Sequence, residues 1–276
     1  MSLRTLAPAV LLATSLAAGC VAARTVAATQ PGSPAAFDPA KSDEKAIAIA
    51  DRVLTAVGGE AAWLATKEIV WSQRILHDGK AVVDGKHAWD RWNGRHRYSW
   101  PDPEGQEIVA MYELDSDVGS ATVDKRGVSS GSGVNIIAEA KKRWAADTYM
   151  LFMPFKLKDP GMKLGWVEER ADEGQTVAKW DVIKVTFEPG VGPSPGDTYY
   201  VLVNRETNLI DIVEHVAAGK SDEQRIGYRW DGWTDSGGLK FSTRRQNIGY
   251  AGEQIEFSGI ELHASPDEDH YVPVLR

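Results

Sequence analysis

The sequence is short of cysteine, of long apolar runs and of basic residues, and each shortage excludes a class of protein. Its 276 residues contain one cysteine, Cys20, so no disulfide framework within the chain can stabilise the fold. No segment after the N-terminus approaches the ~20 apolar residues of a membrane-spanning helix. Lys and Arg number 31 against 39 Asp and Glu, a net charge of −8. Because nucleic-acid binding needs clustered positive charge, we expect no nucleic-acid partner.

The first 20 residues have the three regions of a secretory signal peptide. Arg4 lies in a short charged start, residues 6–16 are mostly apolar, and Ala-Ala-Gly precedes Cys20. A cysteine at this junction resembles the lipobox of bacterial lipoproteins, in which cleavage before Cys20 exposes a thiol that receives a diacylglycerol. We therefore predict a signal peptide at 1–19 and lipidation of Cys20. The alternative is an ordinary signal peptide that leaves Cys20 as a free thiol.

The remainder divides into a tether and one domain. Residues 20–41 contain the lipidated cysteine and a flexible stretch rich in Ala, Pro and Thr, and residues 42–276 suffice for a single domain. Val21 follows the cysteine, where Asp would resemble an inner-membrane retention signal. We therefore expect an outer-membrane lipoprotein of the bacterial envelope that faces the periplasm, attached to the membrane by its N-terminal lipid.

Two main helices are predicted within the domain. Ser42 is a candidate N-cap, and one apolar stripe follows it before Gly58 and Gly59 end the helix: Ile47, Ala50, Leu54 and Val57. The second helix is expected over 134–152, with Met153-Pro154 as its end because proline breaks the helical hydrogen-bond ladder.

From Glu68 onward, hydrophobic residues alternate with a period of two, and turn signals recur every ten or so residues. Strands are expected at 68–77, 81–92, 95–101, 107–115, 120–126, 163–170, 177–188, 198–204, 209–217, 224–233, 240–249 and 254–263. Strands joined this closely must be antiparallel, because parallel neighbours need long crossovers. The fold class is therefore mostly β with a few helices, a large curved antiparallel sheet forming an incomplete β-barrel wrapped over helices.

One hairpin can be predicted in detail from Asn93-Gly94, the strongest signal for a two-residue type I′ turn. That turn pairs Trp92 with Arg95 and Asp90 with Arg97, and it gathers aromatic and histidine side chains on one face: His87, Trp89, Arg91, His96, Tyr98 and Trp100. His87 and His96 would then lie four residues apart along the strands, too far to bind one ion. Since the six histidines show no metal spacing either, we expect no metal and no cofactor.

Catalytic motifs are weak. Residues 127–131 match G-x-S-x-G around Ser129, but a hydrolase elbow lies between a parallel strand and a helix, and the surrounding pattern is antiparallel. We interpret 127–133 as a Gly/Ser hinge before a helix that acts as a lid. Asp115 and Asp117 fail as a calcium loop because Arg126 stands where glutamate is needed. Residues 267–270 are interpreted as a solvated tail. No catalytic residue is assigned, and whether the chain is an enzyme stays open.

Three segments together resemble a known family. They are residues 50–60 (ADRVLTAVGGE) followed by Trp63, residues 153–161 (MPFKLKDPG), and residues 195–210 (PGDTYYVLVNRETNLI). They are similar to the LolA/LolB superfamily of bacterial lipoprotein carriers and receptors, and to uncharacterised lipoproteins related to it. The resemblance implies an incomplete antiparallel barrel whose apolar cavity receives acyl chains, and it implies no catalytic motif.

The aromatic residues offer a lining for such a cavity, since a wide curved sheet does not fill its interior with its own side chains. The candidates for ligand binding are Trp71, Trp89, Tyr98, Trp100, Trp144, Phe152, Phe155 and Trp166. The preferred function is a lipoprotein that binds a lipid or acyl chain, and lipid or lipoprotein handling is one role that such binding would serve. The alternatives are a hydrolase acting on envelope lipid or glycan through Ser129 or carboxylates, and a structural scaffolding lipoprotein.

Overall fold

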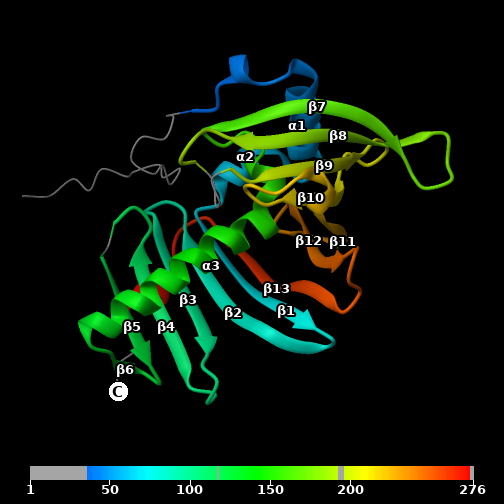
Figure 1. Cartoon of the computed structure of the whole chain (residues 1–276). Coiled ribbons are helices and arrows are strands. Elements are labelled where there is room, and N and C mark those ends of the chain that lie inside the picture. Colours follow the sequence, from blue (N-terminus) through cyan, green and yellow to red (C-terminus); the bar gives the residue numbers. More distant parts are fainter. Residues whose placement is uncertain (1–35, 117, 192–195, 274–276) are drawn as a thin grey trace, which may run out of the picture.

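The computed structural model describes residues 36–116, 118–191 and 196–273; the predicted signal peptide, Cys20 and most of the tether lie outside these ranges. The described chain forms one 13-stranded sheet in the order β6-β5-β4-β3-β2-β1-β13-β12-β11-β10-β9-β8-β7 (Figure 1). Every pair of neighbouring strands is antiparallel, and the two outermost strands, β6 and β7, do not pair with each other. The predicted fold class, a curved and incomplete barrel, is confirmed.

All twelve predicted strands are present, and a two-residue strand, β6, adds a thirteenth. Their bounds are β1 Glu68–His77, β2 Lys80–Asp90, β3 Arg95–Pro101, β4 Glu107–Glu113, β5 Gly119–Val123, β6 Arg126–Gly127, β7 Met162–Ala171, β8 Ala178–Phe187, β9 Thr198–Asn204, β10 Ile210–Val216, β11 Ile226–Ser236, β12 Leu239–Asn247 and β13 Glu253–His263. The helices are α1 Glu44–Ala56, α2 Gly59–Ala65 and α3 Ser130–Lys156, with short 3₁₀ turns at Pro39–Lys41, Asp222–Gln224 and Glu268–Tyr271. None of these helices is both long enough and apolar enough to cross a membrane.

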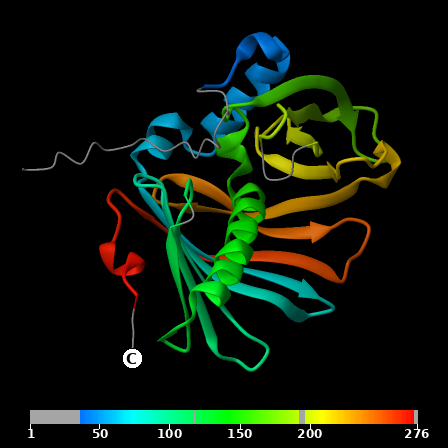
Figure 2. The ribbon, with the colours of Figure 1, turned by 60° about the vertical axis from the view of Figure 1, so that its left-hand side comes forward.

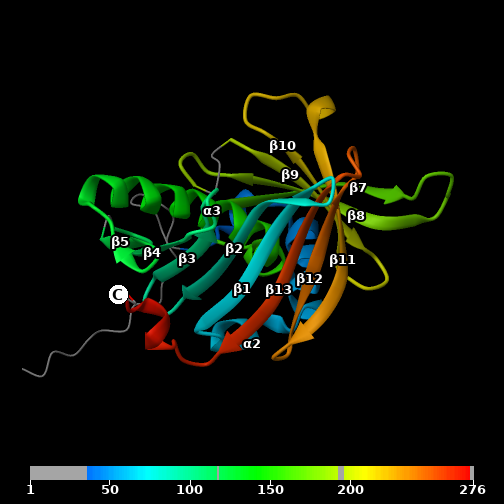
Figure 3. The same cartoon turned by 90° about the horizontal axis from the view of Figure 1, so that it is seen from below.

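Helix α3 lies across the concave face of the sheet, with the strands fanned out behind it (Figure 2). Two hydrophobic clusters hold it there. One joins α1 and the end of α3 to β7–β10: Ile49, Val53, Met153, Leu164, Ile183 and Val201. The other joins α2 and α3 to β1, β12 and β13: Trp63, Trp71, Phe152, Phe241 and Ile255. Seen from below, β3 to β11 form a continuous twisted surface (Figure 3).

The first helix differs from the prediction at its start. Its N-cap is Asp43 rather than Ser42, and neither side chain caps the helix. Instead the Ser42 hydroxyl accepts a hydrogen bond from the Leu164 N–H, and the Asp43 carboxylate accepts one from the Trp166 N–H. Both donors belong to β7, an outermost strand whose free N–H groups need partners. These two residues therefore cover part of a sheet edge.

The predicted hairpin register is wrong by two residues. Asp90 pairs with Arg95, and the loop between them has four residues, 91–94, rather than two. The Asp90 carboxylate accepts hydrogen bonds from the Asn93 N–H and from the Arg95 guanidinium, so it closes the longer loop. Asp90 therefore forms its ion pair with Arg95 and not with Arg97. A shift of two leaves each side chain on its predicted face but changes its neighbours.

Helix α3 does not end before Pro154, as the sequence predicted, but continues to Lys156. Proline has no N–H, so the carbonyl of Met150, four residues earlier, loses its helical donor. The Arg245 guanidinium on β12 donates to that carbonyl at 2.7 Å. It also donates to the backbone carbonyl and the hydroxyl of Ser242 at 3.0 and 2.5 Å and lies 3.4 Å from the Trp230 ring centre. A buried arginine thus completes the helix that proline interrupts.

The acidic C-terminal stretch, interpreted from sequence as a solvated tail, packs against the sheet. Glu68 on β1 is fully buried, and its carboxylate accepts hydrogen bonds from the Tyr271 hydroxyl and the Asp267 N–H. Arg95 on β3 pairs with both oxygens of Glu268. The tail therefore lies against the ends of β1 and β3 (Figure 3).

Candidate functional site

The candidate site is the concave face beneath α3, where most of the predicted ligand-binding aromatic residues meet. Trp71 on β1 contacts Phe152 of α3 edge-on, with ring centres 5.1 Å apart. Trp89 on β2 contacts both Phe152 and Trp144, at 5.7 and 5.9 Å. Phe155 stacks on Trp63 at 4.5 Å. The structure thus gathers five of the eight predicted residues into one interlocked group.

The other three predicted residues occupy different positions. Tyr98 on β3 is buried and stacks on Trp100 at 4.7 Å, beside the first half of α3. Trp166 lies on β7, is 38 % exposed and has the Lys45 amine over its ring. Ser129, the candidate nucleophile of the hydrolase alternative, is exposed; within the described chain its hydroxyl bonds only to Ser132.

A chain of buried polar groups runs through the aromatic group. Asp147 on α3 lies 3.3 Å from Nε2 of His87, whose Nδ1 lies 3.2 Å from Nε2 of His96. Nδ1 of His96 in turn lies 2.9 Å from the Tyr112 hydroxyl. We call these four residues the polar relay; each is less than 5 % exposed. Trp71 stacks flat on the His87 ring at 4.4 Å.

One arrangement of protons with both histidines neutral satisfies the hydrogen bonds from Tyr112 to His96 and from His96 to His87, whereas His87 and Asp147 are in contact at 3.3 Å without forming a hydrogen bond. The Tyr112 hydroxyl donates to His96, the His96 Nε2–H donates to His87, and the His87 Nε2–H points to the Asp147 carboxylate. Burial lowers the pKa of His87 and, together with the nearby His87 ring, lowers that of His96 well below its usual value. Burial also raises the pKa of Tyr112, which keeps its proton. The relay therefore carries one negative charge, on Asp147.

Two further side chains donate hydrogen bonds to the Asp147 carboxylate and stabilise its negative charge. The Gln73 amide donates to Asp147 at 2.7 Å, and the Arg143 guanidinium, one turn earlier on α3, donates at 2.6 Å. Gln73 is on β1 and is 1 % exposed. Asp147 thus joins α3 to β1 and β2. Within the described residues, no group of three or more potential ligands is placed to hold a metal ion.

Folding stability is expected to fall as the pH drops below about 6.5, the usual pKa of histidine in an unfolded chain. The folded-state pKa values of His87 and His96 lie lower. The unfolded chain therefore binds protons that the folded chain does not, and acid favours unfolding. Each histidine contributes a loss of up to ~1.4 kcal/mol per pH unit below ~6.5, until its folded pKa is reached.

Urea unfolding of the wild type and of His96→Gln at several pH values between neutral and mildly acidic measures this effect. The variant removes one titrating group, so its free energy of unfolding is expected to fall by roughly half as much over the same interval. Equal slopes in the two proteins would show that His96 does not titrate on unfolding, whatever the variant's absolute stability.

The two halves of α3 are held differently. Between Ser130 and Trp144 only Gly133, Ile137 and Ala140 are buried, and they lie over β4 and β5. From Asp147 onward nearly every residue is buried among the two hydrophobic clusters. The first half covers the end of the sheet with few buried side chains, whereas the second half is part of the core.

The interior differs from the sequence expectation of an open cavity, because the side chains of α3 pack into it. The described contacts also leave several buried N–H donors without acceptors, among them the indoles of Trp230 and Trp233 and, within this site, those of Trp71 and Trp144. A buried N–H without a partner costs on the order of 1–3 kcal/mol, so a ligand oxygen that accepts a hydrogen bond from one of these indoles would recover that free energy. The Trp71 and Trp144 indoles belong to the aromatic group around the polar relay.

Several residues of the site were not found from the sequence. Asp147, Gln73 and Arg245 are polar residues within apolar patterns, and such residues are more often exposed than buried. Gly85 on β2 has an ordinary backbone conformation, but a side-chain carbon there would lie 2.4 Å from the Tyr98 ring. For Asp147, Gln73 and Arg245, the only signal in the sequence was a polar residue at a position that the hydrophobic periodicity assigned to the core.

Comparisons with known proteins give structural likenesses only. No family profile matches the chain, and no curated protein sequence matches it. The fold is similar to a LolA superfamily protein from Nitrosomonas europaea at 11% identity and a TM-score of 0.46, covering 82% of this chain and 97% of that one. It is also similar to an outer membrane lipoprotein-sorting protein domain from Vibrio parahaemolyticus, at 10% identity and a TM-score of 0.45, covering 83% and 96%.

A third similar structure is a DUF1329 family protein from Desulfovibrio piger, at 9% identity and a TM-score of 0.40, covering 83% of this chain and 98% of that one. The superfamily that the sequence resembles is therefore represented among the structures that the fold is similar to. At these identities, function has to be argued from the residues of this chain.

Proposed function

We propose that the protein is a lipoprotein of the bacterial outer membrane that faces the periplasm and binds a lipid or acyl chain between α3 and the concave face of the sheet. In this proposal residues 1–19 are removed, Cys20 carries the lipid anchor, residues 20–41 are the tether, and residues 42–276 are the binding domain. The observation that supports it most is the aromatic group around the polar relay, covered by a helix of which only the second half is fixed in the core.

The binding step we propose is displacement of the first half of α3. Moving it uncovers Ile137 and the partly buried Ile136, together with the faces of Tyr98 and Tyr112 beneath them, at a cost on the order of 5 kcal/mol. Each methylene of a ligand buried in their place contributes about 0.8 kcal/mol, so roughly six methylenes offset that cost. The hinge lies before Asp147, whose hydrogen bond from Gln73 and contact with His87 stay intact. The indole N–H of Trp144 would bind an oxygen of the ligand's head.

Uptake of acyl ligands tests this proposal directly. The chain lacking residues 1–20 is expected to bind fatty acid from micelles, seen by native mass spectrometry as added mass. Trp144→Leu should weaken uptake, whereas Trp166→Leu, which removes an exposed indole on β7, should leave it unchanged. Both indoles lie outside the fully buried core, so neither variant is expected to unfold. No uptake by the wild type, or equal loss in both variants, would count against binding at this site.

Hydrogen exchange checks the proposed movement separately. Amides of residues 134–144 are expected to exchange faster than those of residues 147–156 in the free protein, because fewer of their side chains are buried. Bound fatty acid should change exchange in the first set and leave the second set protected. Uniform protection along α3, unaltered by ligand, would contradict displacement of its first half.

A further inference from the structure

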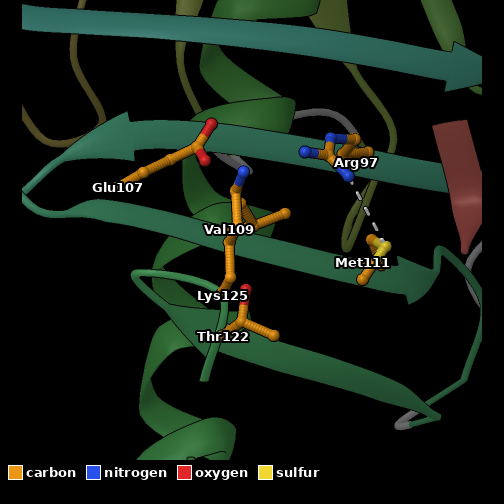
Figure 4. A pocket seen from close by; sticks show the side chains of 6 residues that line it. All are labelled: Arg97, Glu107, Val109, Met111, Thr122 and Lys125. Atoms are coloured by element: carbon orange, nitrogen blue, oxygen red, sulfur yellow. Dashed lines mark hydrogen bonds between the residues drawn. The ribbon is translucent and has the colours of Figure 1, made fainter. Parts of the chain in front are cut away.

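A pocket of about 240 Å³ lies on the face of the sheet opposite α3. Its lining residues alternate along β3, β4 and β5 with those that pack beneath the helix. The lining consists of Arg97, Glu107, Val109, Met111, Thr122 and Lys125. Figure 4 shows these side chains on the near side of the strands, with a helix behind the sheet. The pocket is therefore separate from the aromatic group.

The floor of the pocket is apolar and its walls are charged. Val109, Met111 and Thr122 are all less than 7 % exposed. Lys125 is held at the turn between β5 and β6 in a left-handed backbone conformation, with φ of 63°. In Figure 4 its amine lies above Val109, with Glu107 and Arg97 on either side. Three charged groups thus converge over a buried floor.

The two cations of the pocket have no carboxylate partner within the described chain. The Arg97 guanidinium donates only to the sulfur of Met111, at 3.9 Å, and Lys125 makes no ion pair there. Elsewhere in the described chain, arginines such as Arg95 and Arg225 are paired with carboxylates at 2.7 Å. Burial lowers the pKa of Arg97, and the charge of Glu107 opposes that shift only in part. The pocket therefore has a net positive charge and unused hydrogen-bond donors.

We propose that this pocket binds a phosphate monoester anion, with its oxygens between the Arg97 guanidinium and the Lys125 amine. A guanidinium pairs with two phosphate oxygens at once, and a lysine amine adds a third, compact charge. A monoester keeps a titratable proton near neutral pH, and it can donate that proton in a hydrogen bond to Glu107. A diester has no such proton and would meet the Glu107 carboxylate unfavourably. The carbon chain of the ester then lies on Val109 and Met111.

Titration with inorganic phosphate and with glycerol phosphate, followed by amide NMR shifts of the chain lacking residues 1–20, tests the proposal. Shifts are expected in β3, β4 and the β5–β6 turn. Arg97→Gln and Lys125→Met should each weaken binding about tenfold or more, since each removes a charged hydrogen bond. Glu107→Gln removes both a negative charge and the acceptor of the monoester's proton, so it should bring the affinity for a phosphate diester closer to that for the monoester. Arg126→Gln, the neighbouring cation that does not line the pocket, is the matched control and should change little.

Vesicles separate the two sources of such a phosphate. If the protein sediments with vesicles containing phosphatidic acid but not with those containing phosphatidylglycerol, and Arg97→Gln abolishes sedimentation, the ligand is a lipid headgroup. If the protein binds phosphate but no vesicles, the ligand is a small soluble ester. Absence of shifts at the pocket, or affinity unchanged in Arg97→Gln with the fold intact by thermal melting, would overturn the proposal. Neither result affects the acyl-binding proposal, because the two sites lie on opposite faces of the sheet.

Discussion

Replacing Arg245 with methionine is expected to lower the free energy of unfolding by about 3–5 kcal/mol, as measured by urea denaturation. The guanidinium is fully buried and donates to the backbone carbonyls of Met150 and Ser242. Removing it leaves these acceptors unpaired in the core. Burying a cation without a carboxylate partner costs free energy, and methionine removes that cost. Methionine restores none of the lost hydrogen bonds, however. Arg244→Met, at an exposed neighbouring position, should change stability by less than about 1 kcal/mol.

A double-mutant comparison tests whether Arg245 compensates for the hydrogen bond that Pro154 removes from α3. In the Pro154→Ala background the N–H of residue 154 can donate to the Met150 carbonyl, so that carbonyl no longer depends on Arg245. Arg245→Met should therefore cost about 1 kcal/mol less in that background than in the wild type. Strict additivity of the two substitutions would show that the Arg245 bond to Met150 does not compensate for the proline.

Asp147→Asn is the second substitution with a large expected effect, a loss of about 3 kcal/mol in the free energy of unfolding. The asparagine presents an NH₂ group where the carboxylate accepts hydrogen bonds from Gln73 and Arg143 and faces His87. It also removes the only negative charge of the polar relay. Amide exchange along α3 should increase, because Asp147 joins the helix to β1 and β2.

Glu139→Gln is the matched control for Asp147→Asn. It makes the same chemical change on the same helix, at an exposed position two turns earlier, and should alter stability by no more than about 0.5 kcal/mol. Equal effects of the two variants would mean that Asp147 does not hold the helix to the sheet.

The sheet could be predicted from the sequence because its alternation and turn signals repeat along the chain. Every strand came from a local pattern of period two, and antiparallel pairing followed from the short connections. The position of α3 in the fold could not be predicted in this way, since helix-to-sheet packing depends on contacts between distant residues. Its continuation through Pro154 depends on Arg245, 91 residues later in the chain.

The polar relay was missed because of the error in one hairpin. With a two-residue turn, His87 would lie opposite Trp100 and away from His96. The loop that Asp90 closes moves His87 opposite Tyr98, diagonal to His96, and their nitrogens come within 3.2 Å. The hydrogen bonds of the Asp90 side chain therefore overrode the local turn signal of Asn93-Gly94, and they determined which residues meet in the core.

The aromatic residues were easier to predict as a group than one by one. Their abundance and their period placed most of them on the inner face, and the structure brings Trp71, Trp89 and Phe152 into contact. Trp166 lies outside this group because β7 is the outermost strand at the end of the sheet farther from β1 and β2. Alternation alone does not reveal the order of the strands in a sheet.

The central claim, that an acyl chain binds between α3 and the concave face, is tested most directly by photo-crosslinking. A fatty acid with a diazirine in its chain is bound to the protein lacking residues 1–20, illuminated, and located by peptide mass spectrometry. We expect cross-links to α3 and to the facing residues of β1, β2 and β3. Cross-links confined to exposed positions such as Leu64 and Trp166, or none at saturating ligand, would contradict it.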